Sequence, residues 1–401
     1  INGISNNEKA VLLLEKRTFK ELLVDMELRN LQNNIVGQEA SRLFARAEIN
    51  MGVEAFRDSL YSLLKRNTFL NIKFENMLDT LGEISRTDIR SLLGEWEKTT
   101  PLPFYSLGEP TLTKITNKGG EEFFVLKMLI SNNSDYDGII HMDIRKDGWW
   151  YQPLEDPRAK TKIEMPAHTS KEFVSVWEDQ IRNVEINTMV SGNLPNIISQ
   201  DINNVKQERN KIVKDSIYIL PESSFDLPGE IIVDNEDSTL FILSAPPIVG
   251  LLPKWLDEVE ETPFKYSGIS WWRPPLQWTA TTNDRYYGKY IRSAFVIKSG
   301  DGSQTATWKV PVPEVGQYDL YYHVFKDDEL RWNNNLQGEY HFKVKYGSEV
   351  EDAYVNLRKA NEGWEQLGSY YFDSDTIRVV LTDECKLRSV TADAVKIVKR
   401  Y

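Results

Sequence analysis

The spacing of apolar residues in the first quarter of the chain is typical of amphipathic helices. Between about residues 8 and 98 they recur every three or four positions, as at Phe56, Leu60 and Leu63. We therefore predict a helical subdomain over residues 1–100.

Two signals mark the end of this helical segment. Ser85 followed three residues later by Asp88 resembles a capping box, so we expect the last helix to begin at Ser85. Pro101 and Pro103 interrupt any further helix and mark a boundary.

Beyond the prolines the pattern changes to short β-type runs. Residues 123–126 and 139–144 are rich in β-branched and aromatic side chains, and the turn sequence 117–120 precedes the first of them. We predict a small β-sandwich over residues 101–170.

The rest of the chain divides into a connector and a larger strand-rich domain. Residues 171–230 are polar, and their Lys- and Glu-rich part predicts a helix at about 202–214. Alternating strands then return over residues 231–401. The expected fold is multi-domain α+β: a helical bundle, a small β-sandwich and a C-terminal antiparallel β-sandwich of the jelly-roll, galactose-binding-like kind.

The length and the net charge of the chain limit the classes of function that it can have. A chain of 401 residues is too long for one core, and a net charge of −12 repels phosphate backbones and anionic lipid. Nucleic-acid binding and peripheral membrane binding are therefore disfavoured. The most apolar run, Leu240 to Pro253, has about 14 residues and is too short to span a bilayer.

The residues near Ile1 show no basic segment followed by an apolar one, so we expect an excised or mature segment of a longer protein. Cys385 is the single cysteine and permits no internal disulfide.

Catalytic motifs are missing from the sequence. The four histidines, His141, His168, His323 and His341, are scattered and form no His-Glu-x-x-His zinc motif. There is no Gly-x-Ser-x-Gly elbow, and the glycine-containing segment 299–303 lacks the lysine and the helix of a phosphate-binding loop. We predict no catalytic residue and no cofactor in this chain.

Asp234, Glu236 and Asp237 form an acidic group directly after an apolar run. Their oxygen atoms could bind calcium, although solvation of a strand end explains the same pattern more simply.

Aromatic residues are concentrated in the C-terminal third. A platform for stacking sugar rings is predicted from Trp271, Trp272, Trp278, Tyr286, Tyr287 and Arg285. The alternative is that most of these rings pack inside the sandwich. Trp271 and Trp272 are adjacent, so on a strand they point to opposite faces and one of them should be exposed.

Four motifs in the last 170 or so residues resemble the golvesin C-terminal-like domain, also called the xanthan-lyase-type carbohydrate-binding-like domain. They are Tyr287–Tyr290, Ala306–Trp308 with Pro313–Tyr318, Gly363–Gly368, and Thr391–Val395. The resemblance implies a sandwich attached to enzymes and surface proteins, with a carbohydrate-binding role. Trp364 and Leu367 are expected as core anchors, and Asp393 as a structural hydrogen-bond acceptor.

The first 165 or so residues resemble the region after the active site of aminopeptidase-N-like gluzincins, especially those fused to ABC-transporter permeases in Bacteroidetes. The matching segments are 40–60, 92–96, 101–103, 186–188 and 193–195. The resemblance implies that a zinc motif would lie upstream of this chain and that the parent protein is anchored in a membrane.

The leading hypothesis is a non-catalytic C-terminal portion of a larger extracytoplasmic, periplasmic protein that binds a glycan or a neighbouring protein domain. One alternative is a cleft-forming part of an active zinc aminopeptidase. The other is a purely structural spacer whose aromatic rings are all internal.

Overall fold

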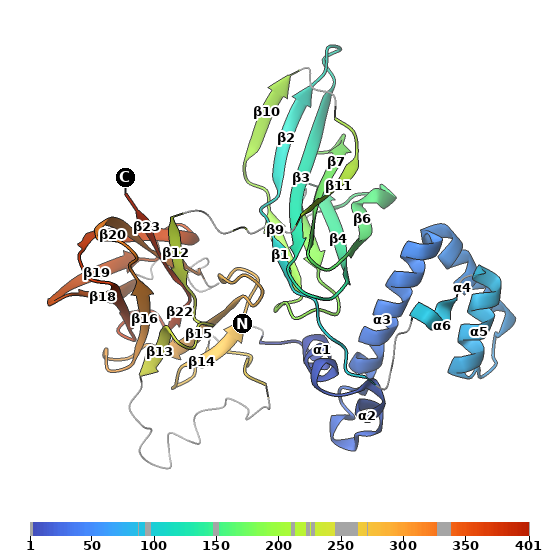
Figure 1. Cartoon of the computed structure of the whole chain (residues 1–401), viewed down its shortest axis with the longest axis horizontal. Helices are drawn as coiled ribbons and strands as arrows, with labels where there is room; N and C mark the ends of the chain where they lie inside the picture. Colours follow the sequence, from blue (N-terminus) through green and yellow to red (C-terminus); the bar gives the residue numbers. More distant parts are fainter. Residues whose placement is uncertain are drawn as a thin grey trace. The chain divides into compact units, whose positions relative to one another are not determined.

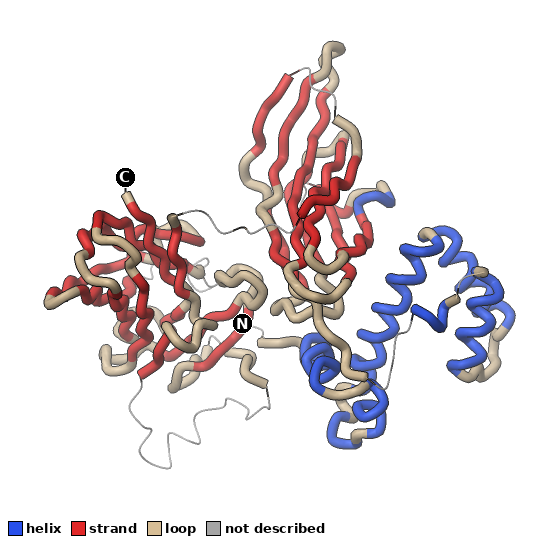
Figure 2. Tube along the Cα trace, viewed as in Figure 1, coloured by secondary structure: helices blue, strands red, loops and turns tan. Residues whose placement is uncertain are grey.

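The computed structural model describes residues 3–86, 88–92, 98–146, 152–209, 213–221, 225, 229–244, 264–270, 272–326 and 338–400. Helices fill the N-terminal part and strands fill most of the rest (Figures 1 and 2), which confirms the predicted α+β fold. The chain forms two compact units: an N-terminal unit of residues 6–225, and a C-terminal unit of residues 226–401 together with residues 1–5. Among the described helices, none has the length and apolarity needed to cross a membrane.

Six α-helices and one short 3₁₀ turn precede the first strand of the described chain. They are α1 (Asn6–Lys16), α2 (Phe19–Val24), η1 (Met26–Leu28), α3 (Gln32–Met51), α4 (Val53–Arg66), α5 (Phe74–Ser85) and α6 (Ile89–Leu92). Thr18 and Glu21 form a capping box that starts α2. Gly52 has a φ of 83° and separates α3 from α4, because most other residues avoid that conformation.

The helices pack around two small apolar cores. One contains Leu14, Leu22 and Ile35, where α1 and α2 meet the first half of α3. The other contains Leu43 and Leu78, where α4 and α5 meet the second half of α3. The longest helix, α3, therefore joins both cores.

The expected helix start at Ser85 is wrong. Ser85 is the last residue of α5, because Arg86 takes the left-handed conformation with φ 54° and ends that helix. Asp88 instead accepts a hydrogen bond from the Ser91 amide at 3.2 Å and caps α6.

A β-sandwich completes the N-terminal unit. Its strands are β1 (Tyr105–Leu107), β2 (Thr111–Thr116), β3 (Glu122–Asn132), β4 (Gly138–Lys146), β5 (Gln152–Pro153), β6 (Lys160–Met165), β7 (Thr169–Trp177), β8 (Ile181–Asn187), β9 (Ile197–Asp201), β10 (Val205–Arg209) and β11 (Ser216–Pro221), with the 3₁₀ turn η2 (Pro157–Ala159). Sheet A has the order β10-β2-β3-β7-β11, with β1 beside β3, and sheet B has the order β5-β4-β8-β9, with β6 beside β4. Leu126 and Met128 from sheet A share one core with Ile140 and Met142 from sheet B.

Residues 171–230, where we expected a connector, hold strands β8 to β11 and most of β7. The helix expected at about 202–214 is wrong, because residues 205–209 form strand β10. This strand pairs in parallel with β2, and Val205 packs against the sandwich core. Pairing with a neighbouring strand outweighs the helix preference of the charged residues around it.

The C-terminal unit is the predicted second sandwich. Its strands are β12 (Glu230–Val233), β13 (Phe241–Ser244), β14 (Thr279–Thr282), β15 (Ser293–Lys298), β16 (Thr305–Pro311), β17 (Gly316–Val324), β18 (Glu339–Tyr346), β19 (Glu349–Asn356), β20 (Gly363–Phe372), β21 (Thr376–Thr382), β22 (Ser389–Ala392) and β23 (Val395–Lys399). Sheet C has the order β12-β23-β17-β20, sheet D the order β13-β16-β21-β18-β19, and sheet E the order β14-β15-β22. Trp308, Tyr322 and Phe342 are completely buried in the shared core.

The first residues of the chain belong to this C-terminal unit because Gly3 packs directly on its backbone. A Cβ at Gly3 would lie only 2.2 Å from the carbonyl carbon of Ser267 and the amide of Gly268. A glycine is therefore required at this close approach.

Buried polar contacts hold the N-terminal unit together. Glu8 of α1 ties the helices to the sandwich, because it accepts a hydrogen bond from the Asn196 amide at 2.9 Å. Within the sandwich, Asn193 of the β8–β9 loop accepts from the Tyr105 amide of β1 at 2.9 Å and donates to the Tyr105 carbonyl at 2.8 Å. These bonds satisfy backbone groups that no strand pairs.

We expect Asn193→Ala to lower the free energy of unfolding of the N-terminal unit by about 2–3 kcal/mol, because it leaves two buried backbone groups of Tyr105 without a partner. Urea titration followed by circular dichroism measures this loss. The control is Asn204→Ala at an exposed position, which should change little. Equal stability of both variants would contradict the role given to Asn193.

Candidate functional site

The polar centre of the C-terminal unit is the side chain of Asp393, in the turn between β22 and β23. It is completely buried, and both of its carboxylate oxygens lie 3.2 Å from the Tyr287 amide. Its Oδ2 lies 2.8 Å from Nδ1 of His323. Burial raises the pKa of this carboxyl group, and the charge and hydrogen bond of His323 oppose that rise. These contacts confirm the expected role of Asp393 as a structural acceptor.

Three rings gather over this buried carboxylate. The ring of Trp364 lies 5.1 Å from Tyr287 and 5.1 Å from His323, measured between centroids, and Tyr287 lies 5.8 Å from His323. The ammonium of Lys396 lies 4.9 Å from the centroid of Trp364. We call Tyr287, His323, Trp364 and Lys396 the aromatic cluster.

Strand pairing places the cluster on the outward face of sheet C. His323 of β17 lies directly opposite Trp364 of β20, and Tyr321 lies opposite Lys396 of β23. Tyr322, between Tyr321 and His323, is completely buried in the core, so its neighbours point outward. Trp364 is therefore not the core anchor we expected, whereas Leu367 does pack against the core.

Two ion pairs are made by a member of the cluster or by residues close to its members in sequence. Lys396 pairs with Glu230 at 2.9 Å. Arg285 pairs with Glu362 at 3.0 Å, donates to the Lys326 carbonyl and stacks on Phe325. These contacts fix the long side chain of Lys396 beside Trp364 and that of Arg285 beside Phe325.

His323 is held by the buried carboxylate of Asp393. The bond from His323 to a buried carboxylate resembles the orienting bond of a general base. Within the described residues, however, no hydroxyl or thiol makes a hydrogen bond with the other ring nitrogen of His323. His323 instead links Asp393 to the ring of Trp364.

The structure separates the residues of the predicted platform. Tyr286 is buried and packs on Phe325, and Trp278 packs against the core. Tyr287 belongs to the aromatic cluster, whereas Arg285 packs on Phe325. Trp272 alone among the described platform tryptophans is largely exposed, at 63%.

Trp272 does not lie on a strand as we assumed. Ser270 and Arg273 bridge to each other in a tight turn, and Trp272 lies at its tip, where the guanidinium of Arg388 is 4.6 Å from its ring centroid. Trp271 lies outside the described residues. The expectation that one member of the pair is exposed is confirmed for Trp272.

The acidic group of residues 234–237 is engaged within the protein. Asp237 accepts hydrogen bonds from the amides of Thr239 and Leu240, and Glu236 pairs with Lys265 at 2.5 Å. Burial, together with the nearby charge of Asp393, raises the pKa of Asp234 to about 8. Across the described parts of the chain, no three His, Cys, Asp or Glu side chains are arranged to hold a metal ion.

The segment 299–303 is a crossover between sheets E and D. Its Gly302 amide donates to the buried carboxylate of Asp383 at 2.8 Å, so a side chain of the protein fills the place that an external anion would take.

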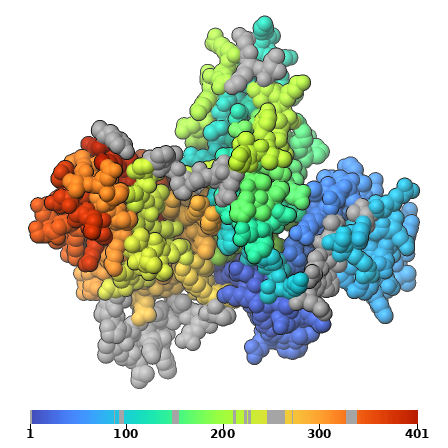
Figure 3. All heavy atoms as spheres, in the orientation of Figure 1, coloured from blue at the N-terminus to red at the C-terminus, as the bar shows by residue number. Residues whose placement is uncertain are grey.

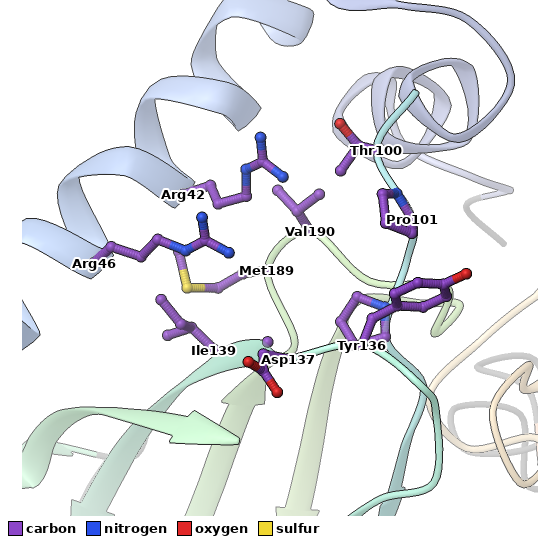
Figure 4. A pocket seen from close by; sticks show the side chains of 11 residues that line it. Arg42, Arg46, Thr100, Pro101, Tyr136, Asp137, Ile139, Met189 and Val190 are labelled. Carbon is purple, nitrogen blue, oxygen red and sulfur yellow. The ribbon is translucent and has the colours of Figure 1, made fainter. Parts of the chain in front are cut away.

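A separate cavity of about 270 Å³ lies in the N-terminal unit (Figure 4). Arg42 and Arg46, one turn apart on α3, line one side, and Asp137 lies across from them. Arg42 donates to Glu39 at 2.6 Å. Burial lowers the pKa of Arg46, and Glu39 and Asp137 oppose this shift. Their carboxylates balance the arginine charges, so the cavity makes a weaker candidate than the aromatic cluster.

Comparisons with known proteins agree with part of the sequence interpretation. Residues 274–399 match the Golvesin C-terminal domain family. No curated protein sequence matches the chain. All four members of the aromatic cluster lie inside the matched segment.

Two solved structures illustrate how distant the structural matches are. A Bacteroides uniformis β-glucuronidase is 12% identical, with 79% of this chain and 32% of that chain covered and a TM-score of 0.21. The Legionella pneumophila aminopeptidase A is 17% identical, with 31% of this chain and 14% of that chain covered and a TM-score of 0.15. TM-scores this low do not establish a shared fold.

Sequence reasoning missed His323, Tyr321 and Lys396 as site residues. The alternation within β17 was the available signal, because Tyr321 and His323 alternate with the apolar residues Leu320, Tyr322 and Val324.

We expect the stability of the C-terminal unit to fall as pH rises, because the pKa of Asp234 is about 8 in the folded state and 3.8 ordinarily. A raised folded-state pKa contributes stability at low pH, and this contribution is lost as pH rises toward 8. Asp234→Asn removes the titration. Between about pH 5 and about pH 8, the free energy of unfolding should therefore fall by on the order of 1–3 kcal/mol less in the variant than in the wild type.

Thermal unfolding of the wild type and the variant at about pH 5 and about pH 8 measures this difference. The control is Asp373→Asn at an exposed position. A wild type and a D234N variant that lose stability in parallel would show that Asp234 does not titrate in this range.

Proposed function

We propose that the C-terminal unit is a glycan-binding module and that this chain works by binding, as a non-catalytic part of a larger extracytoplasmic bacterial protein. The observation that carries the proposal is the aromatic cluster on the outward face of sheet C. The match of residues 274–399 to the Golvesin C-terminal domain supports it.

Aromatic rings beside fixed polar groups suit a sugar. The C–H faces of a sugar ring pack on aromatic rings, and its hydroxyl groups need donors and acceptors at set positions. Trp364, Tyr287 and Tyr321 supply partly exposed rings. The ion pairs Lys396–Glu230 and Arg285–Glu362 supply both donors and acceptors.

The buried carboxylate makes this surface rigid. Asp393 holds the backbone of Tyr287 and the ring of His323, and both of these pack on Trp364. A preformed surface loses little conformational entropy when a ligand binds. This favours recognition of a weakly interacting ligand such as a polysaccharide.

The test is affinity electrophoresis of the full chain through native gels that contain bacterial or host polysaccharides. We expect one or more polysaccharides to retard the wild type. Trp364→Ala and Tyr321→Ala should weaken binding at least about tenfold, as for other residues at the centre of a binding surface. The matched control is Tyr354→Ala, an exposed tyrosine on β19 of sheet D.

A further variant separates the two exposed aromatic sites. Loss of binding in Trp272→Ala, with binding kept in Trp364→Ala, would move the glycan site to the turn at residues 270–273. No retardation of the folded wild type by any polysaccharide would overturn the proposal.

A further inference from the structure

The helical hairpin of α4 and α5 ends in an exposed apolar tip that the C-terminal sandwich and its proposed function do not explain. We define the tip as residues 61–74, the end of α4, the following turn and the first residue of α5. Five large apolar side chains there are exposed: Tyr61, Leu64, Phe69, Leu70 and Phe74. Figure 3 shows the lighter blue atoms of this hairpin at the surface of the molecule.

The core of the hairpin leaves these five side chains out. Phe56 of α4 is buried in one cluster with Leu78 and Leu81 of α5, and Leu63 is buried on the same helix. Tyr61 and Leu64 are three residues apart on α4 and lie on a different side from Leu63. Their side chains are more than 60% exposed. The five exposed side chains of the tip are therefore not part of the core that stabilises the hairpin.

Phe69 is the most exposed apolar side chain of the tip. Its side chain is fully exposed, and its backbone has a φ of 61°, in the left-handed region that bulky residues rarely occupy. The turn is nevertheless well defined, because the Leu70 amide donates to the Asn67 carbonyl at 3.0 Å and Asn67 donates to the Leu63 carbonyl at 2.9 Å. An ordered turn thus presents two adjacent apolar side chains, Phe69 and Leu70, to solvent.

Basic residues flank these side chains, and acidic residues are missing. Lys65, Arg66 and Lys73 are exposed, and none of them makes an ion pair with the described residues. There is no Asp or Glu from Ser59 to Phe74, and Glu75, the next residue, is held by Arg90 at 2.5 Å. The tip is therefore positive within a chain whose net charge is −12.

We propose that this tip inserts into the surface of a membrane that contains anionic lipids. Apolar side chains at the end of a rigid hairpin can enter the boundary between headgroups and acyl chains. Flanking lysine and arginine side chains can then reach the anionic headgroups. A tip that enters only this boundary anchors a protein at one leaflet without crossing the bilayer. The net charge of the whole chain disfavours membrane binding in general, so this local reversal of charge determines which end approaches the lipid.

The primary test is co-sedimentation of the full chain with vesicles of phosphatidylcholine and phosphatidylglycerol, in parallel with vesicles of phosphatidylcholine alone. We expect binding to the anionic vesicles that decreases as salt rises, and little binding to the neutral ones. The double variant Phe69→Ser/Leu70→Ser should lose at least about tenfold in partitioning, because each large side chain contributes more than 1.4 kcal/mol when buried. Both residues are exposed, so circular dichroism should be unchanged.

Matched variants separate the apolar and the electrostatic contributions. Val350→Ser/Tyr354→Ser removes two exposed apolar side chains elsewhere and should bind like the wild type. Replacing Lys65, Arg66 and Lys73 with Gln should abolish the preference for anionic vesicles. The same replacement of the exposed residues Lys118, Lys359 and Lys386 changes the net charge equally and should preserve that preference.

A probe at the tip tests insertion directly. In a Cys385→Ser background, Phe69→Cys labelled with an environment-sensitive dye should report an apolar surrounding on anionic vesicles, whereas Tyr354→Cys should not. Absence of sedimentation with anionic vesicles, or binding that persists in F69S/L70S, would overturn the proposal. A tip that binds no vesicle would instead be a surface for another protein.

Discussion

The C-terminal sandwich depends on the buried carboxylate of Asp393. A completely buried carboxyl group is costly unless hydrogen-bond donors surround it. The Tyr287 amide and His323 supply these donors from a loop and from β17, respectively. Asp393 thereby links segments more than 60 residues apart, and the rings of Tyr287, His323 and Trp364 take their positions from it. Burial of Asp234, together with the nearby charge of Asp393, likewise raises the pKa of the Asp234 carboxyl group.

The N-terminal unit is held together by a different kind of contact. Its helices and its sandwich each have their own apolar cores, and buried polar groups connect them. Glu8 of α1 accepts a hydrogen bond from the Asn196 amide of the sandwich, and Glu48 of α3 pairs with Lys162 of β6. Polar contacts of this kind require specific geometry and therefore fix how the two parts join, whereas apolar contacts tolerate small shifts.

Charge in this protein has to be considered by region. The net charge of −12 describes the average surface, but the tip of the α4–α5 hairpin carries three basic residues and no acidic residue. Electrostatic interactions between exposed charges extend only about 10 Å at moderate salt, so a local cluster can act against the average. The net charge of the whole chain does not reveal such a local positive cluster.

The sequence by itself determined that the N-terminal part is helical and the C-terminal part is built of strands, the match to the Golvesin C-terminal domain, and the role of Asp393 as an acceptor. These follow from periodicity and from short motifs, which depend on neighbours in the chain. Only the tertiary structure decided that residues 205–209 form a strand, that Trp364 faces outward, that Tyr286 is buried, and that Trp278 packs against the core. The position of a ring depends on which strand lies opposite it and on the face it occupies. Those are properties of pairing between distant segments, and a local pattern does not contain them.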